Sequence, residues 1–223
     1  MTPIVLTIKW LGHACFLITT MAGTNIVIDP FEPTVGYKAP AVKADVVFVS
    51  HEHFDHNAVG LLRGNPRVIG PLSGRTPERG TIKIGSDRIR YLCTAANHDS
   101  SGGKQRGTVT ISVIEADGVR ICHLGDLGHI LSPSQVKAIG RVDVLMIPVG
   151  GIYTIDGRQA KQVVQQLKPK YVIPMHYKTP ALKISLNTAD EFLKGYKRVK
   201  HADKLRVSKG SLPEETTVVV LKY

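Results

Sequence analysis

The chain has 223 residues, a hydrophobic content of 43% and a formal net charge of +11. This length fits one domain over residues 1–223, with enough apolar material for a core that needs no disulfides. No apolar run approaches the ~18 residues of a transmembrane helix, and the N-terminal residues lack a signal-peptide pattern. Three well-separated cysteines exclude a disulfide framework and favour a reduced, cytoplasmic protein.

Lys and Arg number 29 against 18 Asp and Glu, and much of the excess lies between residues 194 and 209. Such a charge attracts anions, either small molecules or nucleic acid. Tyr196 is the only aromatic residue in the basic segment, so the stacking pattern of a nucleic-acid binder is absent there. An anionic small-molecule substrate is therefore the preferred partner, and nucleic acid is the alternative. The oligomeric state has no signature in the sequence.

Strand patterns dominate the first 124 residues, and strand and helix patterns alternate after them. Asp117-Gly118 predicts a hairpin turn, and the Ser132-Pro133 pair predicts the start of a helix that stops at Gly140. The predicted strands are 5–10, 14–20, 25–29, 45–50, 88–96, 108–116, 119–124, 143–148, 171–174 and 216–221. The predicted helices are 57–63, 132–140, an amphipathic helix over 160–167, and 188–195.

Two continuous apolar runs, DVVFVS at 45–50 and DVLMIP at 143–148, each precede a predicted helix. Such runs are typical of strands that are buried on both faces. The repeated order indicates two similar halves, each a sheet with helices on one side. Packed together, the halves bury both sheets and leave the helices outside. We therefore predict an α/β (α+β) fold arranged as a four-layer αββα sandwich.

The segment His51-Glu52-His53-Phe54-Asp55-His56 follows the first of these runs directly. Imidazole and carboxylate groups are the ligands that zinc and neighbouring metals prefer. In an extended segment His51 and His53 point to the same side, and a following turn lets Asp55 and His56 reach a second ion. With 9 histidines in the chain, HxHxDH arises by chance roughly once in a thousand such sequences. The motif therefore predicts a metal centre.

This pattern resembles the metallo-β-lactamase superfamily, whose members carry an Asp after an early strand, HxHxDH, a His, an Asp and a final His. The matching positions, in order, are Asp29, residues 51–56, His98, Asp126 and His176. The resemblance covers about residues 8 to 180. Trp10-Leu11-Gly12-His13-Ala14 is similar to the opening motif of a branch of small hydrolases that includes ascorbate-phosphate lactonase-like proteins, with similarity also to phospholipase D-type phosphodiesterases.

The resemblance implies a metallo-β-lactamase type sandwich with two divalent ions, zinc by default and manganese or iron as alternatives. Asp126 would bridge the ions, and Asp29 would orient a ligand without binding metal itself. The first ion would be held by His51, His53 and His98, and the second by Asp55, His56 and His176.

The implied reaction is hydrolysis of an anionic phosphoester, lactone or similar ester by a metal-bound hydroxide. Asp55 and Asp126 are then catalytic as well as metal-binding. His129 is the first candidate for a general acid, because it follows Asp126 by three residues, and Tyr153 is the second. Tyr153 is also expected to contact the substrate.

The polar loop 97–107 follows a predicted strand and contains several glycines. Lys104 and Arg106 lie within eight residues of His98, so we expect them to bind the anionic part of the substrate. The planar fork of Arg106 makes it the better candidate of the two.

Two other functions remain open. A mononuclear iron oxidoreductase of the same fold would use His51, His53 and a carboxylate, but it would not require the complete second set. A metal-stabilised binding module without catalysis is the other alternative. The sequence assigns no role to His13 or His123.

Overall fold

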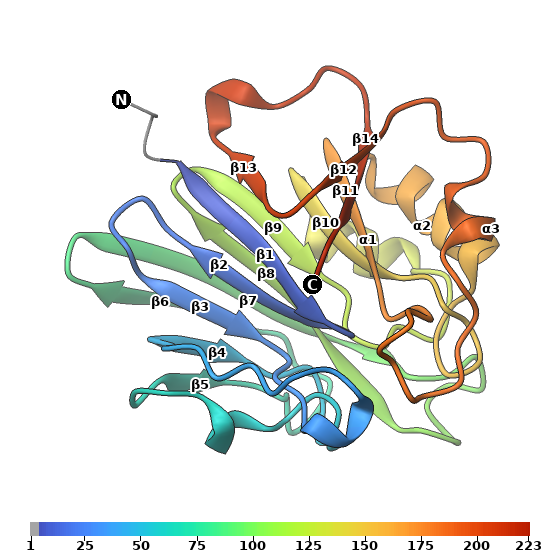
Figure 1. Ribbon diagram of the computed structural model, residues 1–223, viewed down its shortest axis with the longest axis horizontal. Helices are drawn as coiled ribbons and strands as arrows, with labels where there is room; N and C mark the ends of the chain where they lie inside the picture. The colour runs from blue at the N-terminus through green and yellow to red at the C-terminus, as the bar shows by residue number, and fades with distance from the viewer. Residues whose placement is uncertain (1–4) are drawn as a thin grey trace.

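The computed structural model describes residues 5–223 as two β-sheets packed face to face (Figure 1). The first sheet has the strand order β13-β1-β2-β3-β4-β5. Strands β13, β1, β2 and β3 pair antiparallel, whereas β3, β4 and β5 are parallel. The bounds of these strands are Leu6–Gly12 for β1, Cys15–Thr19 for β2, Asn25–Ile28 for β3, Val46–Phe48 for β4, Arg67–Ile69 for β5 and Leu205–Val207 for β13.

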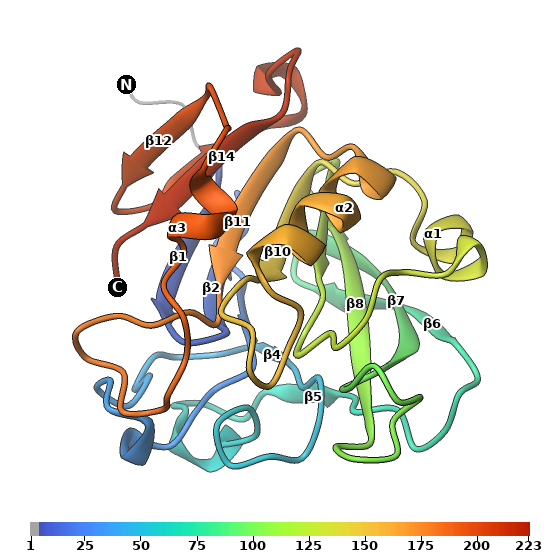
Figure 2. The same cartoon turned by 90° about the vertical axis from the view of Figure 1, so that its right-hand side faces the viewer.

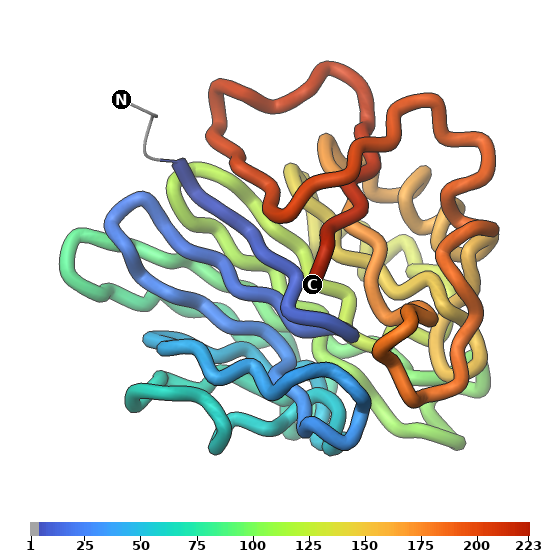
Figure 3. The backbone as a smooth tube through the Cα atoms, in the orientation of Figure 1, coloured from blue at the N-terminus to red at the C-terminus, as the bar shows by residue number. Residues whose placement is uncertain are grey.

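The second sheet has the order β12-β14-β11-β10-β9-β8-β7-β6. It is antiparallel from β6 to β9 and parallel from β9 to β12. Its strands are β6 (Glu78–Ile84), β7 (Asp87–Asn97), β8 (Thr108–Ala116), β9 (Val119–His123), β10 (Val144–Pro148), β11 (Tyr171–Met175), β12 (Val199–Ala202) and β14 (Thr217–Leu221). The end of the chain returns to both sheets, so β13 lies beside β1 in the backbone trace (Figure 3).

Alternation along the buried strands separates two apolar clusters. Ile26 and Phe48 belong to the large cluster that joins the two sheets, whereas Val27 and Val47 belong to a smaller one. The first sheet is thus covered on both faces, as the continuous apolar run 45–50 predicts.

Three α-helices lie on the outer face of the eight-stranded sheet (Figure 2): α1 (Pro133–Ile139), α2 (Gly157–Leu167) and α3 (Asp190–Leu193). Helix α2 buries the predicted stripe of Ala160, Val163, Val164 and Leu167. Its first turn is capped by the Asp156 carboxylate, which accepts two backbone N–H groups. None of the helices in residues 5–223 has the length and apolar character needed to cross a membrane.

The first sheet has a thinner outer layer than predicted. It consists of the 3₁₀ turns η1 (Pro33–Val35) and η2 (Val59–Leu61) with the apolar residues of segment 181–186. The predicted helix at 57–63 is wrong, because only η2 forms there. Val59 and Gly60 are poor helix formers, and η2 has no side-chain cap at its N-terminus, unlike the seven-residue helix α1. The αββα order of layers is nevertheless confirmed.

Gly128 allows the two loops of the later metal-binding motifs to approach each other. Its N–H donates to the carbonyl of Asn97 at 3.0 Å. A Cβ at position 128 would lie 2.3 Å from the Asp99 nitrogen and 2.4 Å from the His98 carbonyl carbon. Both are backbone atoms, so they cannot move aside as a flexible side chain could. Any side chain here must therefore push the His98 loop away from the Asp126 loop.

We expect Gly128→Ala to lower the free energy of unfolding by about 1–3 kcal/mol, the usual cost of overpacking. Urea unfolding followed by circular dichroism measures this change. Gly74→Ala is the matched control, because a Cβ there meets nothing within 4 Å. Equal unfolding energies for the two variants would contradict the close approach at Gly128.

Candidate metal centre

The residues of the predicted metal centre follow strands that end at the same edge of the sandwich. Strands β3 and β4 are parallel neighbours, as are β9, β10 and β11, so their C-terminal ends point the same way. The segments after β3, β4, β7, β9 and β11 contain Asp29, residues 51–56, His98, Asp126 and His176. Both sheets therefore contribute to one site.

Three imidazoles form a first donor group, which consists of His51, His53 and His98. One ring nitrogen from each lies within 4.8 Å of the others. The ring centroids are 4.5 Å apart for His51 and His53, 4.9 Å for His51 and His98, and 5.2 Å for His53 and His98. His51 and His98 are buried while His53 is exposed, so this group is open to solvent on one side.

A second donor group consists of His13, Asp55, His56 and His176, whose ligand atoms also lie within 4.8 Å of one another. Three of these residues are the predicted set for the second ion. His13 is the addition: its Nε2 lies 3.1 Å from Asp55 Oδ2, and its ring centroid lies 4.2 Å from that of His176. The backbone carbonyl of His13 accepts the His176 N–H at 3.0 Å, which ties the start of the chain to the last donor.

The buried carboxylate of Asp126 lies between the two groups. Its Oδ2 is 3.4 Å from His98 Nε2 and 3.9 Å from His51 Nε2, both of the first group. The same oxygen is 3.2 Å from His176 Nε2, and Oδ1 is 3.3 Å from His56 Nε2, both of the second group. One carboxylate thus contacts imidazoles of both groups, as the position of a bridging ligand requires.

Asp29 orients two of these imidazoles through their Nδ1 atoms, His56 directly and His51 through Ser50. Its Oδ2 accepts the Nδ1–H of His56 at 2.9 Å and the hydroxyl of Ser50 at 2.6 Å. Because the single Ser50 proton is donated to Asp29, the Ser50 oxygen accepts the Nδ1–H of His51 at 2.8 Å. In the neutral form of each ring the proton is therefore on Nδ1, and Nε2 is the nitrogen that can bind metal. Asp29 itself contacts neither donor group's centre.

Burial and neighbouring charges shift the pKa values of the donor residues. Burial lowers the pKa of His51 to about 3, and the neighbouring His56 adds to this effect. Burial also lowers the pKa of His98, so both rings are neutral at pH 7. Burial opposes ionisation of Asp126, but His176 and His56 hold the pKa of that carboxyl well below its usual range. Burial alone would lower the pKa of His56, whereas Asp126 and Asp29 raise it, so positive charge is favoured there.

The donor atoms fit a metal centre. Among the described residues, His51 Nε2, His56 Nε2 and Asp126 Oδ1 are buried without a hydrogen-bond partner. Unpartnered buried polar atoms cost free energy unless something binds them. Nitrogen and oxygen donors without thiolate suit zinc, manganese or iron. The arrangement could therefore hold two ions that share one carboxylate.

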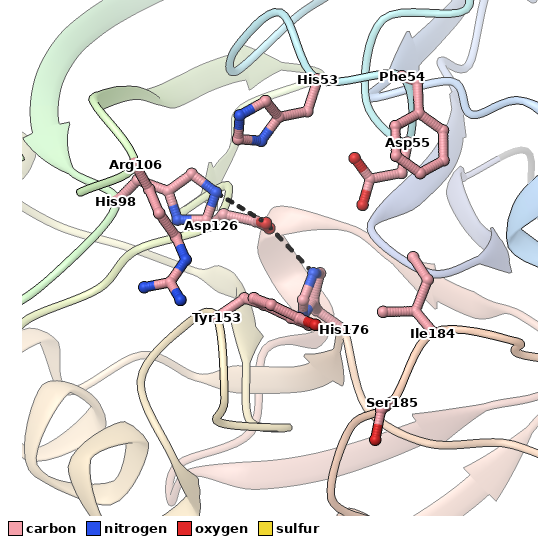
Figure 4. Close-up of a pocket in the computed structure, with 10 residues that line it drawn as sticks. All are labelled: His53, Phe54, Asp55, His98, Arg106, Asp126, Tyr153, His176, Ile184 and Ser185. Carbon is pink, nitrogen blue, oxygen red and sulfur yellow. Dashed lines mark ion pairs between the residues drawn. The ribbon is translucent and has the colours of Figure 1, made fainter.

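A cavity of about 550 Å³ opens over the donors, which is within the range of small-molecule sites (Figure 4). Arg106 and Tyr153, for which we predict contact with substrate, both line it, and the guanidinium carbon lies 5.4 Å from the centroid of the tyrosine ring. The lining residues are His53, Phe54, Asp55, His98, Arg106, Asp126, Tyr153, His176, Ile184 and Ser185.

Asp99 shapes the loop that carries Arg106. Its carboxylate accepts four backbone N–H groups at 2.7–3.0 Å, from Ser101, Gly103, Gln105 and Arg106. Burial opposes ionisation, but these four donors lower the pKa of Asp99 to about 2. The loop is therefore organised around an internal charge.

Two predicted residues lie away from the cavity. His129 Nε2 accepts the Asn97 N–H at 3.1 Å, and its Nδ1–H donates to the Ile130 carbonyl at 2.7 Å. Both ring nitrogens are thus occupied, and the ring lines a separate depression with Arg75 and Asn97. His129 therefore lies outside the cavity that opens over the donors, and its role as general acid stays a prediction. Lys104 is exposed and is not among the residues that line the cavity, so the prediction that it contacts substrate there is not supported.

Sequence reasoning missed Ser50 and the contact of His13 with Asp55. A serine directly before HxHxDH was a possible signal for the first, and the Trp10-Leu11-Gly12-His13 motif was one for the second. His123 has a structural role: Nε2–H donates to the Ala14 carbonyl at 2.9 Å, and Nδ1 accepts the Gly125 N–H at 3.1 Å. It thereby fixes the turn before Asp126.

Comparison with known proteins shows the family of this chain. The model of the β-lactamase superfamily domain matches residues 7–176. The chain belongs to the metallo-β-lactamase superfamily. It is 36% identical to a UPF0173 metal-dependent hydrolase of Methanoregula boonei over 77% of this chain and 82% of that protein. It is 33% identical to a UPF0173 protein of Pyrococcus furiosus over 77% of this chain and 83% of the other.

A solved structure from Thermotoga maritima, described as a candidate zinc-dependent hydrolase of the metallo-β-lactamase superfamily, is also similar. It is 40% identical, with a TM-score of 0.75, and covers 97% of this chain and 98% of its own. These relatives confirm the predicted superfamily, fold and enzyme class of metal-dependent hydrolase.

We expect Ser50→Ala to weaken zinc binding at the first donor group about 10-fold or more, because His51 loses the partner that orients its ring. Competition with a chromophoric chelator measures the affinity of each site. Ser134→Ala on the exposed face of α1 is the matched control. Equal zinc affinities in the two variants would show that Asp29 does not act on His51 through Ser50.

Proposed function

We propose that the protein is a dinuclear metal hydrolase that cleaves an anionic ester in the cavity over Asp126. The observation that carries the proposal is the position of Asp126, whose carboxylate contacts imidazoles of two separate donor groups. A single-ion site has no need of a second group whose ligand atoms converge within 4.8 Å.

In this proposal the first ion is held by His51, His53 and His98 and the second by Asp55, His56 and His176, with Asp126 shared. Two such ions would supply a nucleophile at neutral pH by acidifying a water molecule, and would polarise the substrate oxygen. Asp29 keeps the Nε2 atoms of His51 and His56 aimed at the ions. His13 donates a hydrogen bond to Asp55 and so fixes that carboxylate.

Arg106 supports an anionic substrate. Its guanidinium lines the cavity beside His98 and stacks on Tyr153 (Figure 4). The stacking limits the freedom of the long side chain, so less entropy is lost when the fork grips a phosphate or carboxylate. Of the two groups considered for assisting the leaving group, Tyr153 lines the cavity and His129 does not.

The alternatives are less well supported. A mononuclear iron oxidoreductase needs only one group of ligands. It does not explain why the ligand atoms of His176, His56 and Asp55 converge in a second group. A binding module without catalysis does not explain why a ligand-sized cavity opens on the donors. Zinc remains the proposed metal, and the buried, unpaired thiols of Cys15, Cys93 and Cys122 support a reducing, cytoplasmic location.

Elemental analysis combined with a hydrolase screen tests the proposal. We expect two ions per chain and turnover of phosphodiesters, phosphomonoesters, lactones or thioesters that disappears with a chelator and returns with zinc. His53→Ala and His176→Ala should each leave about one ion per chain, since each removes a donor from a different group.

His201→Ala is the control, because this exposed histidine of β12 should leave two ions and full activity. One ion per chain in the wild-type protein at saturating zinc would contradict the dinuclear site. Two ions without turnover of any ester class would contradict the hydrolase.

A further inference from the structure

The cavity has an apolar wall that the metal chemistry does not require. Phe54 lines it with 53% of its surface exposed, although large aromatic side chains usually stabilise proteins through burial. Ile184 lines the same wall. A single exposed apolar side chain is ordinary, but two that face a cavity of charged donors point to a ligand.

Phe54 has no place in the core. It belongs to neither of the two apolar clusters of the described chain. Its position is nevertheless fixed, because its carbonyl accepts the Glu32 N–H at 3.2 Å and its neighbours His53 and Asp55 are donors. Figure 4 shows the ring at the edge of the cavity beyond Asp55. The phenyl group is thus held where it can contact a ligand but contributes little to the fold.

Ile184 is also held in place. Leu182 and Leu186 on either side of it are buried in the smaller apolar cluster, and the Lys183 N–H donates to the Val35 carbonyl at 2.8 Å. The segment is therefore anchored on η1, and Ile184 is left half-buried at the cavity wall. A preformed apolar contact needs little reordering when a ligand binds.

The polar end of the cavity and the apolar wall of Phe54 and Ile184 lie on opposite sides of the metal-donor residues. In Figure 4, Arg106 lies beside His98, whereas Phe54 and Ile184 lie beyond Asp55. Next to Arg106 a smaller depression is lined by polar residues, among them Gln105, Thr154 and Gln159. The cavity is therefore cationic and polar at the Arg106 end and apolar at the Phe54 end, and Asp126 lies between the two ends.

We infer that the substrate is amphiphilic, with a phosphate group near the donors and Arg106 and an aliphatic or aromatic group against Phe54 and Ile184. This inference rests on the proposed function for the identity of the reacting centre. The apolar subsite itself is a binding property, so it can be measured without turnover.

Alkylphosphonates provide the probe, because methyl-, butyl- and octylphosphonate carry the same anionic group and their C–P bond is not an ester. Binding to the zinc-loaded protein is measured by isothermal titration calorimetry. Each buried methylene contributes to affinity, so we expect butylphosphonate to bind at least about 10-fold more tightly than methylphosphonate. Phe54→Asn and Ile184→Asn should each bring this ratio toward one, and zinc content verifies that the donors are intact.

Two variants serve as controls. Met21→Gln replaces another exposed apolar residue, remote from the donors in a turn after β2, and should keep the wild-type ratio. Arg106→Gln should weaken binding of all three phosphonates by a similar factor and also keep the ratio.

A ratio near one in the wild-type protein, or a ratio that both Asn variants leave unchanged, overturns the amphiphilic substrate while the proposed hydrolase stands. Failure of all three phosphonates to bind overturns it as well. If affinity rises with the length of the alkyl chain but the protein hydrolyses no ester, the apolar subsite is supported and the proposed hydrolase function is contradicted.

Discussion

The carboxylate of Asp126, buried among imidazoles from both donor groups, is the interaction on which the rest of the site depends. A buried charge is costly unless it is paired and hydrogen-bonded. Here the pairing partners come from different sheets: His56 follows β4 of the first sheet, while His98 and His176 follow β7 and β11 of the second. Burying this charge therefore requires that the two sheets meet in one particular way.

Backbone conformation, a close contact between two loops and the apolar core all help to hold the two sheets in this arrangement. Asp29 has a left-handed backbone, with φ of 46°, and so does His176, with φ of 51°. Such conformations are uncommon for residues with a side chain and occur where the surroundings enforce them. Gly128 supplies the close approach that brings the Asp126 loop against the His98 loop. The apolar core between the sheets stabilises the sandwich, and the donors occupy the edge where its strands end.

The sequence predicted what depends on local pattern. HxHxDH after a buried strand, the capped helix after Ser132 and the amphipathic stripe of α2 are local signals, and the structure contains all three. Four strands were missed, β5, β6, β12 and β13, and every one is the edge strand of a sheet. Edge strands have one unpaired side and carry exposed charged residues, as Glu78–Ile84 does, so their apolar pattern is weak.

The missed parts of the site have a different cause. Spacing in the sequence placed His129 near Asp126, but spacing gives no direction for a side chain, and both nitrogens of this ring bind the backbone instead. Ser50, His13 and Phe54 act through contacts with residues distant in the chain or with a cavity wall. Only the packing of the two sheets brings such groups together, so the motifs around Ser50 and His13 do not show by themselves which residues these side chains contact.

The most direct test of the central claim is calorimetric titration of the metal-free Asp126→Ala protein with zinc. If Asp126 belongs to both ions, its loss weakens both binding events together, because one anionic donor disappears from each donor group at once. A variant that loses only one of the two events, or that binds two zinc ions with wild-type affinity, would contradict the shared carboxylate.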